Sequence, residues 1–259
     1  MLIDSHCHPG DAVRFFPQIE EDRRRLKVIT LASACNQEEF AYNEKLTKRA
    51  AAENASPILP CFAIHPQLLS LDLSCLSLLP YLDRLAFENR LAAIGECGFD
   101  LYNSVFRKTE TQQDELFAAH LETALKYGLP VVLHVRRAIH KIFSYTKTLK
   151  SCKAVVFHSW AGTYDEGKSL LRRGINAYFS FGNTLFNGHK KAMQSCAGLP
   201  AERLLTETDA PYQPQRGRDF SYWTDIPDII KTIAVMRNTN PQEIESQIES
   251  NFFKIGLSV

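Results

Sequence analysis

The sequence lacks the features that mark membrane, fibrous and disulfide-stapled proteins. No apolar run approaches the roughly 18 residues that a transmembrane helix needs. Glycine and proline stand at 12 each without any period, which excludes a collagen-like or low-complexity chain. After Met1 and two further apolar residues the chain enters a polar cluster that begins at Asp4, so we expect no signal peptide.

Neither charge nor cysteine dominates the chain. The 30 basic and 29 acidic residues leave a net charge of +1, so no global field draws the protein to nucleic acid or to a membrane. An anionic partner would therefore need a local patch or bound cations. The 7 cysteines are scattered and form no C-x-x-C pair, which argues against a zinc ribbon or a redox motif. We expect reduced, mostly buried thiols and a cytoplasmic location.

What the chain does have is a regular alternation of two kinds of segment. The 259 residues are 45% hydrophobic and 23% charged, as in an ordinary globular protein. Short, nearly continuous apolar runs are typical of strands buried on both faces of a parallel sheet, and longer amphipathic stretches separate them. Eight such units predict one α/β domain over residues 1–259, a TIM (β/α)8 barrel. A doubly wound open sheet is the alternative, disfavoured because no glycine-rich phosphate turn follows the first run.

These segments define the predicted elements. The predicted strands span residues 2–6, 27–33, 58–64, 91–97, 130–135, 154–158, 177–181 and 203–208. The predicted helices span residues 11–25, 37–53, 76–90, 110–127, 137–149, 164–173, 187–196, 225–237 and 241–255.

Most of the apolar runs end in a metal-ligand or acidic residue type. In barrel enzymes the active site lies at the carboxyl ends of the strands, so these side chains should meet at one place. His6 and His8 have the same parity on a strand and point to the same side. Glu96 ends an apolar run, where a buried carboxylate is costly unless it is paired or bound to a cation. The candidate metal ligands are His6, His8, Glu96, His134, His158 and Asp209.

The size of this set points to more than one ion. A catalytic zinc takes about three protein ligands, whereas two cations about 3.5–4 Å apart and bridged by a carboxylate would use all six. Glu96 is the natural bridge. Simpler explanations stay open for single members: an ion pair to arginine for Glu96, and a helix N-cap for Asp209. The mixed donors suit two divalent ions such as Zn, Mn, Fe or Ni and tolerate Mg, so the identity of the metal stays open.

A set of motifs runs along the chain in a fixed order. The segments are IDSHCH at 3–8, AIHP at 63–66, IGECGFD at 94–100, Gln113 and Phe117 in a Q-x-x-x-F stretch, PVVLHVRRA at 130–138, FHSWAG at 157–162, LLTETDAPY at 204–212 and NFFKIG at 251–256. The ordered set resembles the TatD-related metal-dependent hydrolases, a deoxyribonuclease family of the amidohydrolase superfamily. The resemblance covers the whole chain and implies a TIM barrel with two divalent metals.

The resemblance also implies roles for individual residues. By analogy with the family, one metal would be held by His6, His8, Glu96 and Asp209, and the second by Glu96, His134 and His158. His65 would line the pocket and could touch the substrate phosphate, and Glu207 could reach a further cation or the substrate. Arg136 is a candidate phosphate clamp, or else part of an ion pair at the barrel rim. Trp160, Phe99 or Tyr212 could stack a terminal base.

A few positions depart from the family pattern. Gln67 stands where the family usually has a second histidine, Trp160 and Ala161 replace a phenylalanine and a serine, and Phe99 replaces a leucine. No predicted metal ligand is lost. The departures therefore concern the choice of substrate rather than metal binding.

The leading hypothesis is a metal-dependent deoxyribonuclease that cleaves phosphodiester bonds at single-stranded DNA ends, as a 3′–5′ exonuclease does. A metal-activated water would attack the phosphate, with Asp209 accepting its proton and Glu96 bridging the metals. Two alternatives keep the same barrel. One is a hydrolase of a small ester, lactone, amide or phosphoester, and the other is a non-catalytic metal-binding protein. We expect a monomer without a membrane partner.

Overall fold

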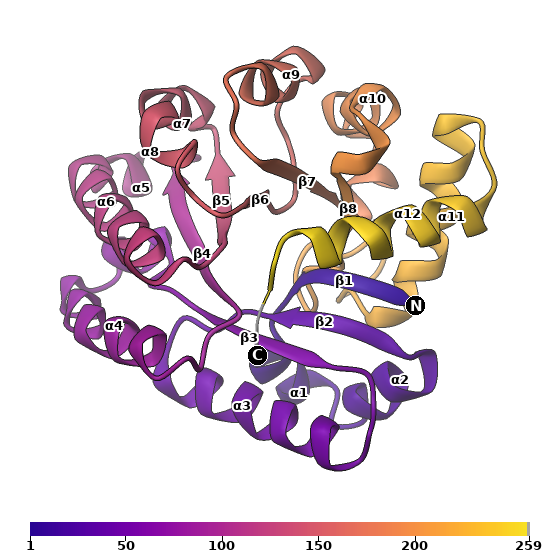
Figure 1. Ribbon diagram of the computed structural model, residues 1–259, viewed down its shortest axis with the longest axis horizontal. Coiled ribbons are helices and arrows are strands. Elements are labelled where there is room, and N and C mark those ends of the chain that lie inside the picture. The colour runs from indigo at the N-terminus through magenta and orange to yellow at the C-terminus, as the bar shows by residue number, and fades with distance from the viewer. Residues whose placement is uncertain (258–259) are drawn as a thin grey trace.

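Eight parallel strands form the centre of the molecule, and helices surround them (Figure 1). The computed structural model describes residues 1–257. The strands pair in chain order from first to last, which confirms the predicted barrel and excludes the doubly wound alternative, whose strand order reverses. The strands are β1 Leu2–Cys7, β2 Val28–Ala32, β3 Ile58–Phe62, β4 Ala93–Asp100, β5 Val131–Arg136, β6 Val155–Phe157, β7 Ala177–Phe181 and β8 Leu204–Thr206.

Three of the predicted helices are interrupted. The helix predicted over residues 11–25 divides into α1 and α2, because Pro17 disfavours the helical conformation at Phe16, whose φ is −134°. The stretch predicted over 76–90 begins as a 3-10 helix, and the one predicted over 137–149 divides at Tyr145.

The α-helices are α1 Pro9–Phe15, α2 Ile19–Leu26, α3 Gln37–Ala52, α4 Leu79–Phe87, α5 Ser104–Arg107, α6 Glu110–Tyr127, α7 Ile139–Ser144, α8 Thr146–Leu149, α9 Tyr164–Arg172, α10 Lys190–Gly198, α11 Ile226–Arg237 and α12 Pro241–Lys254. The 3-10 helices are η1 Pro66–Ser70, η2 Leu73–Leu78, η3 Asn183–Leu185, η4 Ala201–Arg203 and η5 Trp223–Asp225.

Hydrogen bonds between β8 and β1 bring the two ends of the sheet together. The Thr206 hydroxyl donates to the carbonyl of Ile3 at 2.7 Å. Just beyond β8, the N–H of Asp209 donates to the carbonyl of His6 at 2.9 Å. The segment after the last strand is therefore held against the end of the first strand, so that two sets of predicted ligands become neighbours.

The other end of the barrel is tied together by α12. The Asn251 amide donates to the carbonyl of Leu204, where β8 begins, at 2.8 Å. The ammonium group of Met1 pairs with Glu249 of the same helix at 2.5 Å. Figure 1 shows α12 beside the start of β1. This helix therefore fixes the first and last strands at the end away from the predicted ligands.

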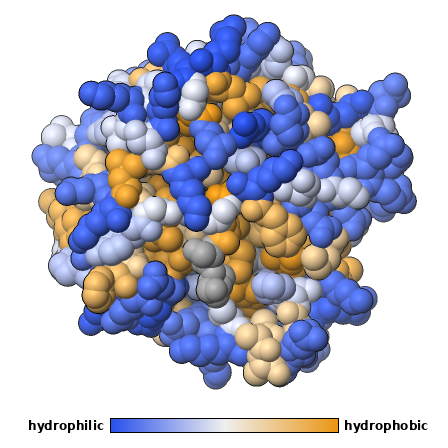
Figure 2. All heavy atoms as spheres, in the orientation of Figure 1, coloured by the Kyte–Doolittle hydropathy of each residue, from blue (hydrophilic) through white to orange (hydrophobic). Residues whose placement is uncertain are grey.

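Apolar side chains fill the interior and polar side chains cover most of the outside. Phe157 and Phe179 stack with ring centroids 5.6 Å apart in the core. Figure 2 shows hydrophilic side chains over most of the visible face, with hydrophobic atoms mainly between them. Within residues 1–257, no helix combines the length and the apolar character that crossing a bilayer would need.

Candidate metal centre

The predicted ligands converge on one cavity at the carboxyl ends of the strands. The cavity has a volume of about 640 Å³. Five of the six predicted ligands line it, and the sixth, His6, is fully buried beside them. The structure thus brings together side chains from β1, β4 and β5 with those just after β6 and β8, which are distant in the sequence. The five on the cavity wall are His8, Glu96, His134, His158 and Asp209.

His6, His8 and Asp209 form a first donor group, which Glu96 joins through one oxygen. The Nε2 atoms of His6 and His8 are 3.1 Å apart. Asp209 Oδ1 lies 3.5 and 3.4 Å from these two nitrogens, and Glu96 Oε2 lies 3.3 and 3.5 Å from them. Four ligand atoms about 2.1 Å from one tetrahedral ion lie about 3.4 Å apart. The measured separations therefore match the coordination sphere of a single ion.

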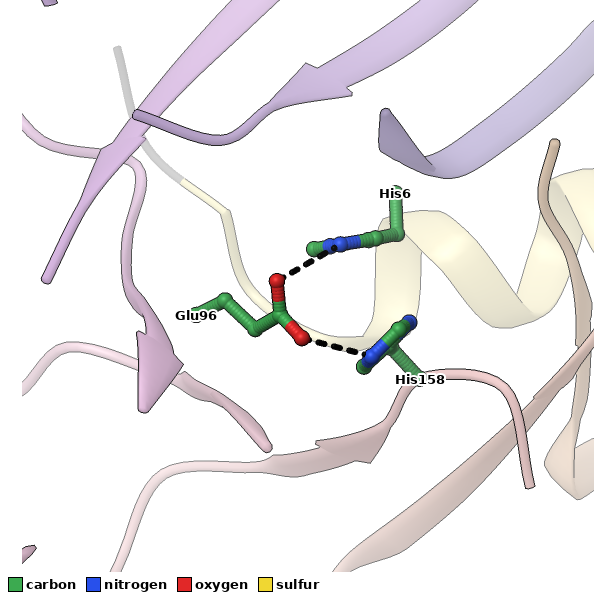
Figure 3. A group of neighbouring side chains, drawn as sticks. All are labelled: His6, Glu96 and His158. Atoms are coloured by element: carbon green, nitrogen blue, oxygen red, sulfur yellow. Dashed lines mark ion pairs between the residues drawn. The ribbon is translucent and has the colours of Figure 1, made fainter. Parts of the chain in front are cut away.

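The second oxygen of Glu96 faces a second donor group. Its Oε1 lies 2.5 Å from Nδ1 of His134, 2.7 Å from Nε2 of His158 and 3.4 Å from Nε2 of His65. Figure 3 shows the carboxylate of Glu96 directing one oxygen to His6 and the other to His158. One carboxylate thus lies between two donor groups, which is the position of a bridging ligand. His65, predicted to line the pocket, does so and also stands with the second group.

The electrostatics of the cluster fit bound cations. Burial raises the pKa of Glu96, but the surrounding imidazoles outweigh it and hold that pKa well below its usual range. Burial lowers the pKa of His8, but Asp209 and Glu96 outweigh it and raise that pKa to about 10. Two carboxylates buried side by side are costly unless positive charge lies among them, whether it is a proton on His8 or a bound cation. This donor set fits divalent ions with mixed nitrogen and oxygen ligation.

A carboxylate behind His134 orients its ring, and sequence reasoning missed it. Asp100 Oδ2 lies 3.0 Å from Nε2 of His134 and accepts a hydrogen bond from the Gln67 amide at 2.6 Å. Burial raises the pKa of Asp100, but these two partners outweigh it and lower that pKa to about 2. Carboxylates commonly fix ligand histidines in this way. Asp100 lies four residues after Glu96 on β4, where the period of two indicates the same side of the strand.

Glu207 lies behind His158 rather than on the cavity wall. Its side chain is 1% exposed, and Oε1 accepts a hydrogen bond from the N–H of Ser159 at 2.7 Å. The same oxygen is 3.5 Å from Nδ1 of His158. Glu207 therefore contacts a predicted metal ligand, and its position does not fit direct contact with a substrate.

The aromatic residues predicted to stack a base fall into two kinds. Trp160 is 3% exposed, with its ring centroid 4.8 Å from that of Phe179, and Phe99 is 0% exposed. Their burial in the core rules out stacking on a substrate base, so that prediction is wrong for both. Tyr212, in contrast, lines the cavity and donates its hydroxyl proton to Asp11 at 2.6 Å. Arg136 also lines the cavity, and its binding to phosphate stays a prediction.

Comparisons with known proteins point to one family. The sequence model of the family described as TatD related DNase matches residues 3–255. An uncharacterised metal-dependent hydrolase of Buchnera aphidicola is 27% identical over 98% of this chain and 95% of its own length. A 3′-5′ ssDNA/RNA exonuclease TatD of Erwinia tasmaniensis is 35% identical over 66% of this chain and 68% of its own length. The crystal structure of YjjV, a TatD homologue from Escherichia coli, superposes with a TM-score of 0.83 at 25% identity, covering 98% of this chain and 97% of that one.

Proposed function

We propose a substrate and a role for each site residue from one premise: the chain belongs to the TatD-related DNase family and is a metal-dependent hydrolase. The proposed activity is the removal of nucleotides from the 3′ ends of single-stranded nucleic acid by hydrolysis of a phosphodiester bond. The proposed form is a monomer in the cytoplasm. Its 7 cysteines are all free thiols, which fits a reducing compartment.

The observation that carries the proposal is the shared carboxylate of Glu96 on the wall of a nucleotide-sized cavity. Its two oxygens face two donor groups, and a pair of ions bridged in this way suits phosphodiester hydrolysis. The cavity lining also includes the apolar side chains of Leu68, Leu71 and Val135. A nucleotide combines an anionic phosphate with a flat, weakly polar base. The phosphate would lie at the metal ligands, and the base would pack against the apolar side chains. The volume of about 640 Å³ is within the range of small-ligand sites.

Two divalent cations are the proposed cofactors. His6, His8, Asp209 and Glu96 would hold one, and Glu96, His134 and His158 would hold the other, with His65 beside them. When bound, such ions polarise the phosphate and lower the pKa of a nearby water. Zn, Mn and Mg are all compatible with these donors.

Asp209 is the proposed general base. Its φ of +57° is a left-handed conformation that few residues other than glycine adopt, and such outliers collect at functional sites. Burial raises the pKa of Asp209, but its hydrogen bond with His8 and the nearby imidazoles outweigh it and lower that pKa, which keeps the carboxylate ionised, the form that can accept a proton. Gln213 donates to Oδ2 at 2.6 Å and holds the carboxylate in one orientation.

The phosphate is the proposed partner of His65 and Arg136, which lie on the cavity wall. A guanidinium can bind two phosphate oxygens at once, and the exposed Arg136 side chain can move to do so. The base is the proposed partner of Tyr212, which is 47% exposed on the same wall.

The test is cleavage of an end-labelled single-stranded DNA with Mg²⁺ or Mn²⁺. We expect stepwise shortening of the labelled strand, which a chelator abolishes. Asp209→Asn should reduce the rate about a thousandfold or more, because the base is removed. Asp228→Asn on the exposed surface of α11, where Asp228 pairs with Lys231, is the matched control and should cleave like the unchanged protein.

Two results would overturn parts of the proposal. Full activity of Asp209→Asn would exclude Asp209 as the base. Hydrolysis of bis(p-nitrophenyl) phosphate without any cleavage of DNA or RNA would keep the metal chemistry and assign the protein to the small-ester alternative.

A further inference from the structure

We propose that single-stranded nucleic acid runs from the metal centre across a surface formed by Tyr102, Arg107, Arg136 and Arg137, here called the arginine shelf. Arg136, on the cavity wall, would bind the phosphate that is cleaved, and Arg107 and Arg137 would bind the backbone phosphates next to it. The inference rests on the proposed function and extends it, because it assigns the path of a polymer and not only the place of the reacting bond.

The shelf begins on the cavity wall and continues outward. Arg136 lines the cavity, and its guanidinium carbon is 3.7 Å from the centroid of the Tyr102 ring. The guanidinium carbon of Arg137 is 4.6 Å from the same centroid. Arg107, on α5, donates through Nη2 to the carbonyl of Tyr102 at 3.4 Å. Three cationic side chains therefore gather around one exposed aromatic residue.

The backbone brings Arg136 and Arg137 to the same side. Successive residues of a strand point to opposite faces, so two neighbouring arginines at the end of β5 would ordinarily diverge. Arg137 leaves the strand conformation with a φ of +55°, a left-handed value that is rare for a residue with a side chain. Both guanidinium groups thereby approach the ring of Tyr102. The turn concentrates positive charge at the rim of the cavity.

The charge of the shelf is not neutralised by the protein surface. Within residues 1–257, neither Arg107 nor Arg137 has a carboxylate within 4.0 Å, and Arg136 reaches only Asp100, at 4.0 Å. The Asp100 carboxylate is buried and already bound to His134 and Gln67. Elsewhere on the surface, Arg24 and Arg25 each pair with an acidic side chain.

A phosphate chain is the ligand that this chemistry selects. Guanidinium groups bind phosphate oxygens through paired hydrogen bonds, and stacking on an aromatic ring holds them in place before the ligand arrives. The net charge of +1 means that long-range attraction is weak. Retention of a polyanion near the metal centre would therefore depend on a local patch such as this one.

The experiment separates binding along the strand from chemistry at the reacting bond. The double variant Arg107→Gln/Arg137→Gln removes two charges from the shelf and leaves Arg136 in place. The control Arg24→Gln/Arg25→Gln removes two charges from α2, where both arginines line a surface cavity beside Met1 at the other end of the barrel. Each protein is assayed on a dinucleotide with a single phosphodiester bond and on a single-stranded DNA of about twenty nucleotides.

We expect the shelf variant to raise KM for the long strand about tenfold at low salt and to leave kcat/KM for the dinucleotide within about twofold. The slope of log affinity against log salt concentration should fall by about 1.4, or about 0.7 for each lost phosphate contact. The control variant should match the unchanged protein on both substrates. An equal loss on both substrates, no loss on either, or the same loss in the control would overturn the proposal.

A binding measurement keeps this test independent of turnover. Fluorescence anisotropy of a labelled oligonucleotide is recorded on Asp209→Asn, with and without the two shelf substitutions. About tenfold weaker binding in the shelf variant supports the shelf even if the unchanged protein cleaves no nucleic acid, a result that would contradict only the proposed function. Equal binding by both proteins contradicts the shelf even if cleavage is normal.

Discussion

Two clusters of buried charge lie at opposite ends of the barrel, and only one of them is complete by itself. Near the start of β2, Arg23 is fully buried and donates to both oxygens of Glu20 at 2.7 and 2.8 Å. It also donates to the carbonyls of Val28 and Ser56 at 2.7 and 2.8 Å. Donors and acceptors are matched there, as buried charge requires.

The cluster at the carboxyl ends of the strands is not matched in this way. His6 and His8 direct ring nitrogens at each other 3.1 Å apart, and the Glu96 carboxylate sits among several imidazoles that compete for its two oxygens. The comparison shows how to distinguish a structural ion pair from a binding site. The first fills its own hydrogen-bonding capacity, whereas the second is arranged around atoms that the chain does not supply.

The largest expected effect comes from Glu96→Gln. The amide keeps the shape but loses the charge that both donor groups share, so we expect the protein to lose bound metal and to cleave DNA about a thousandfold more slowly or worse. Metal content by mass spectrometry and the rate of DNA cleavage check this. Glu20→Gln in the other cluster is the matched control and should keep its metal. Full metal content in Glu96→Gln would remove the distinction between the two clusters.

Arg23→Met should lower the stability of the protein and leave its activity unchanged. It leaves Glu20 as a buried carboxylate without its cation, so the free energy of unfolding should fall by about 3–5 kcal/mol. Urea denaturation measures the loss, while DNA cleavage per folded molecule should be unchanged. A decrease of less than about 1 kcal/mol would mean that the Arg23 cluster is not the completed structural pair that its geometry indicates.

His120 extends the comparison to a single buried histidine that stands outside both donor groups. It is 0% exposed, its Nε2 accepts a hydrogen bond from the N–H of Ile64 at 3.1 Å, and burial lowers its pKa to about 3. Above pH 6.5, the ordinary pKa of histidine, the ring is neutral in both the folded and unfolded states. As pH falls from there towards 3, only the unfolded state gains the proton, so stability decreases. At pH 5, protonation of His120 in the unfolded state should lower the free energy of unfolding by about 2 kcal/mol.

His120→Gln replaces the nitrogen acceptor with an amide oxygen that does not titrate. The variant should therefore lose less stability than the unchanged protein between pH 7 and pH 5, by about 2 kcal/mol. Chelator-treated protein is used for both, so that metal release does not contribute. Identical acid dependence of the two unfolding free energies would show that His120 is not the neutral buried group described above.

Local sequence patterns predicted the strands well and the helices less well. Nearly continuous apolar runs such as 130–135 are typical of strands that are buried on both faces of a parallel sheet. The structure has β5 at Val131–Arg136. Helix boundaries depend on single residues, and Pro17 divides the first predicted helix. The meeting of the six candidate ligands could be predicted because the carboxyl ends of the strands in a barrel lie at one end of it, wherever they lie in the sequence.

The residues behind the ligands could not be predicted in the same way. Asp100 is an ordinary acidic residue in the sequence, and the resemblance assigned Glu207 to a cation or the substrate rather than to a place behind His158. Their contacts with His134 and His158 depend on side-chain directions across neighbouring strands. Trp160 lies two residues after the predicted ligand His158, which suggested contact with substrate, but its ring turns into the core. The shelf arginines are separate in the sequence, and the φ of +55° at Arg137 that brings two of them onto one ring has no sequence signal.

The sequence by itself determined the barrel and the family and singled out six candidate ligands, because each depends on periodicity or on the order of short motifs. Only the tertiary structure decided that Glu96 stands between two donor groups, that Asp100 orients His134, and that Arg136 opens onto an unneutralised surface. These are distances between segments that lie far apart along the chain. Packing of the whole barrel sets them, and no local pattern of residues encodes them.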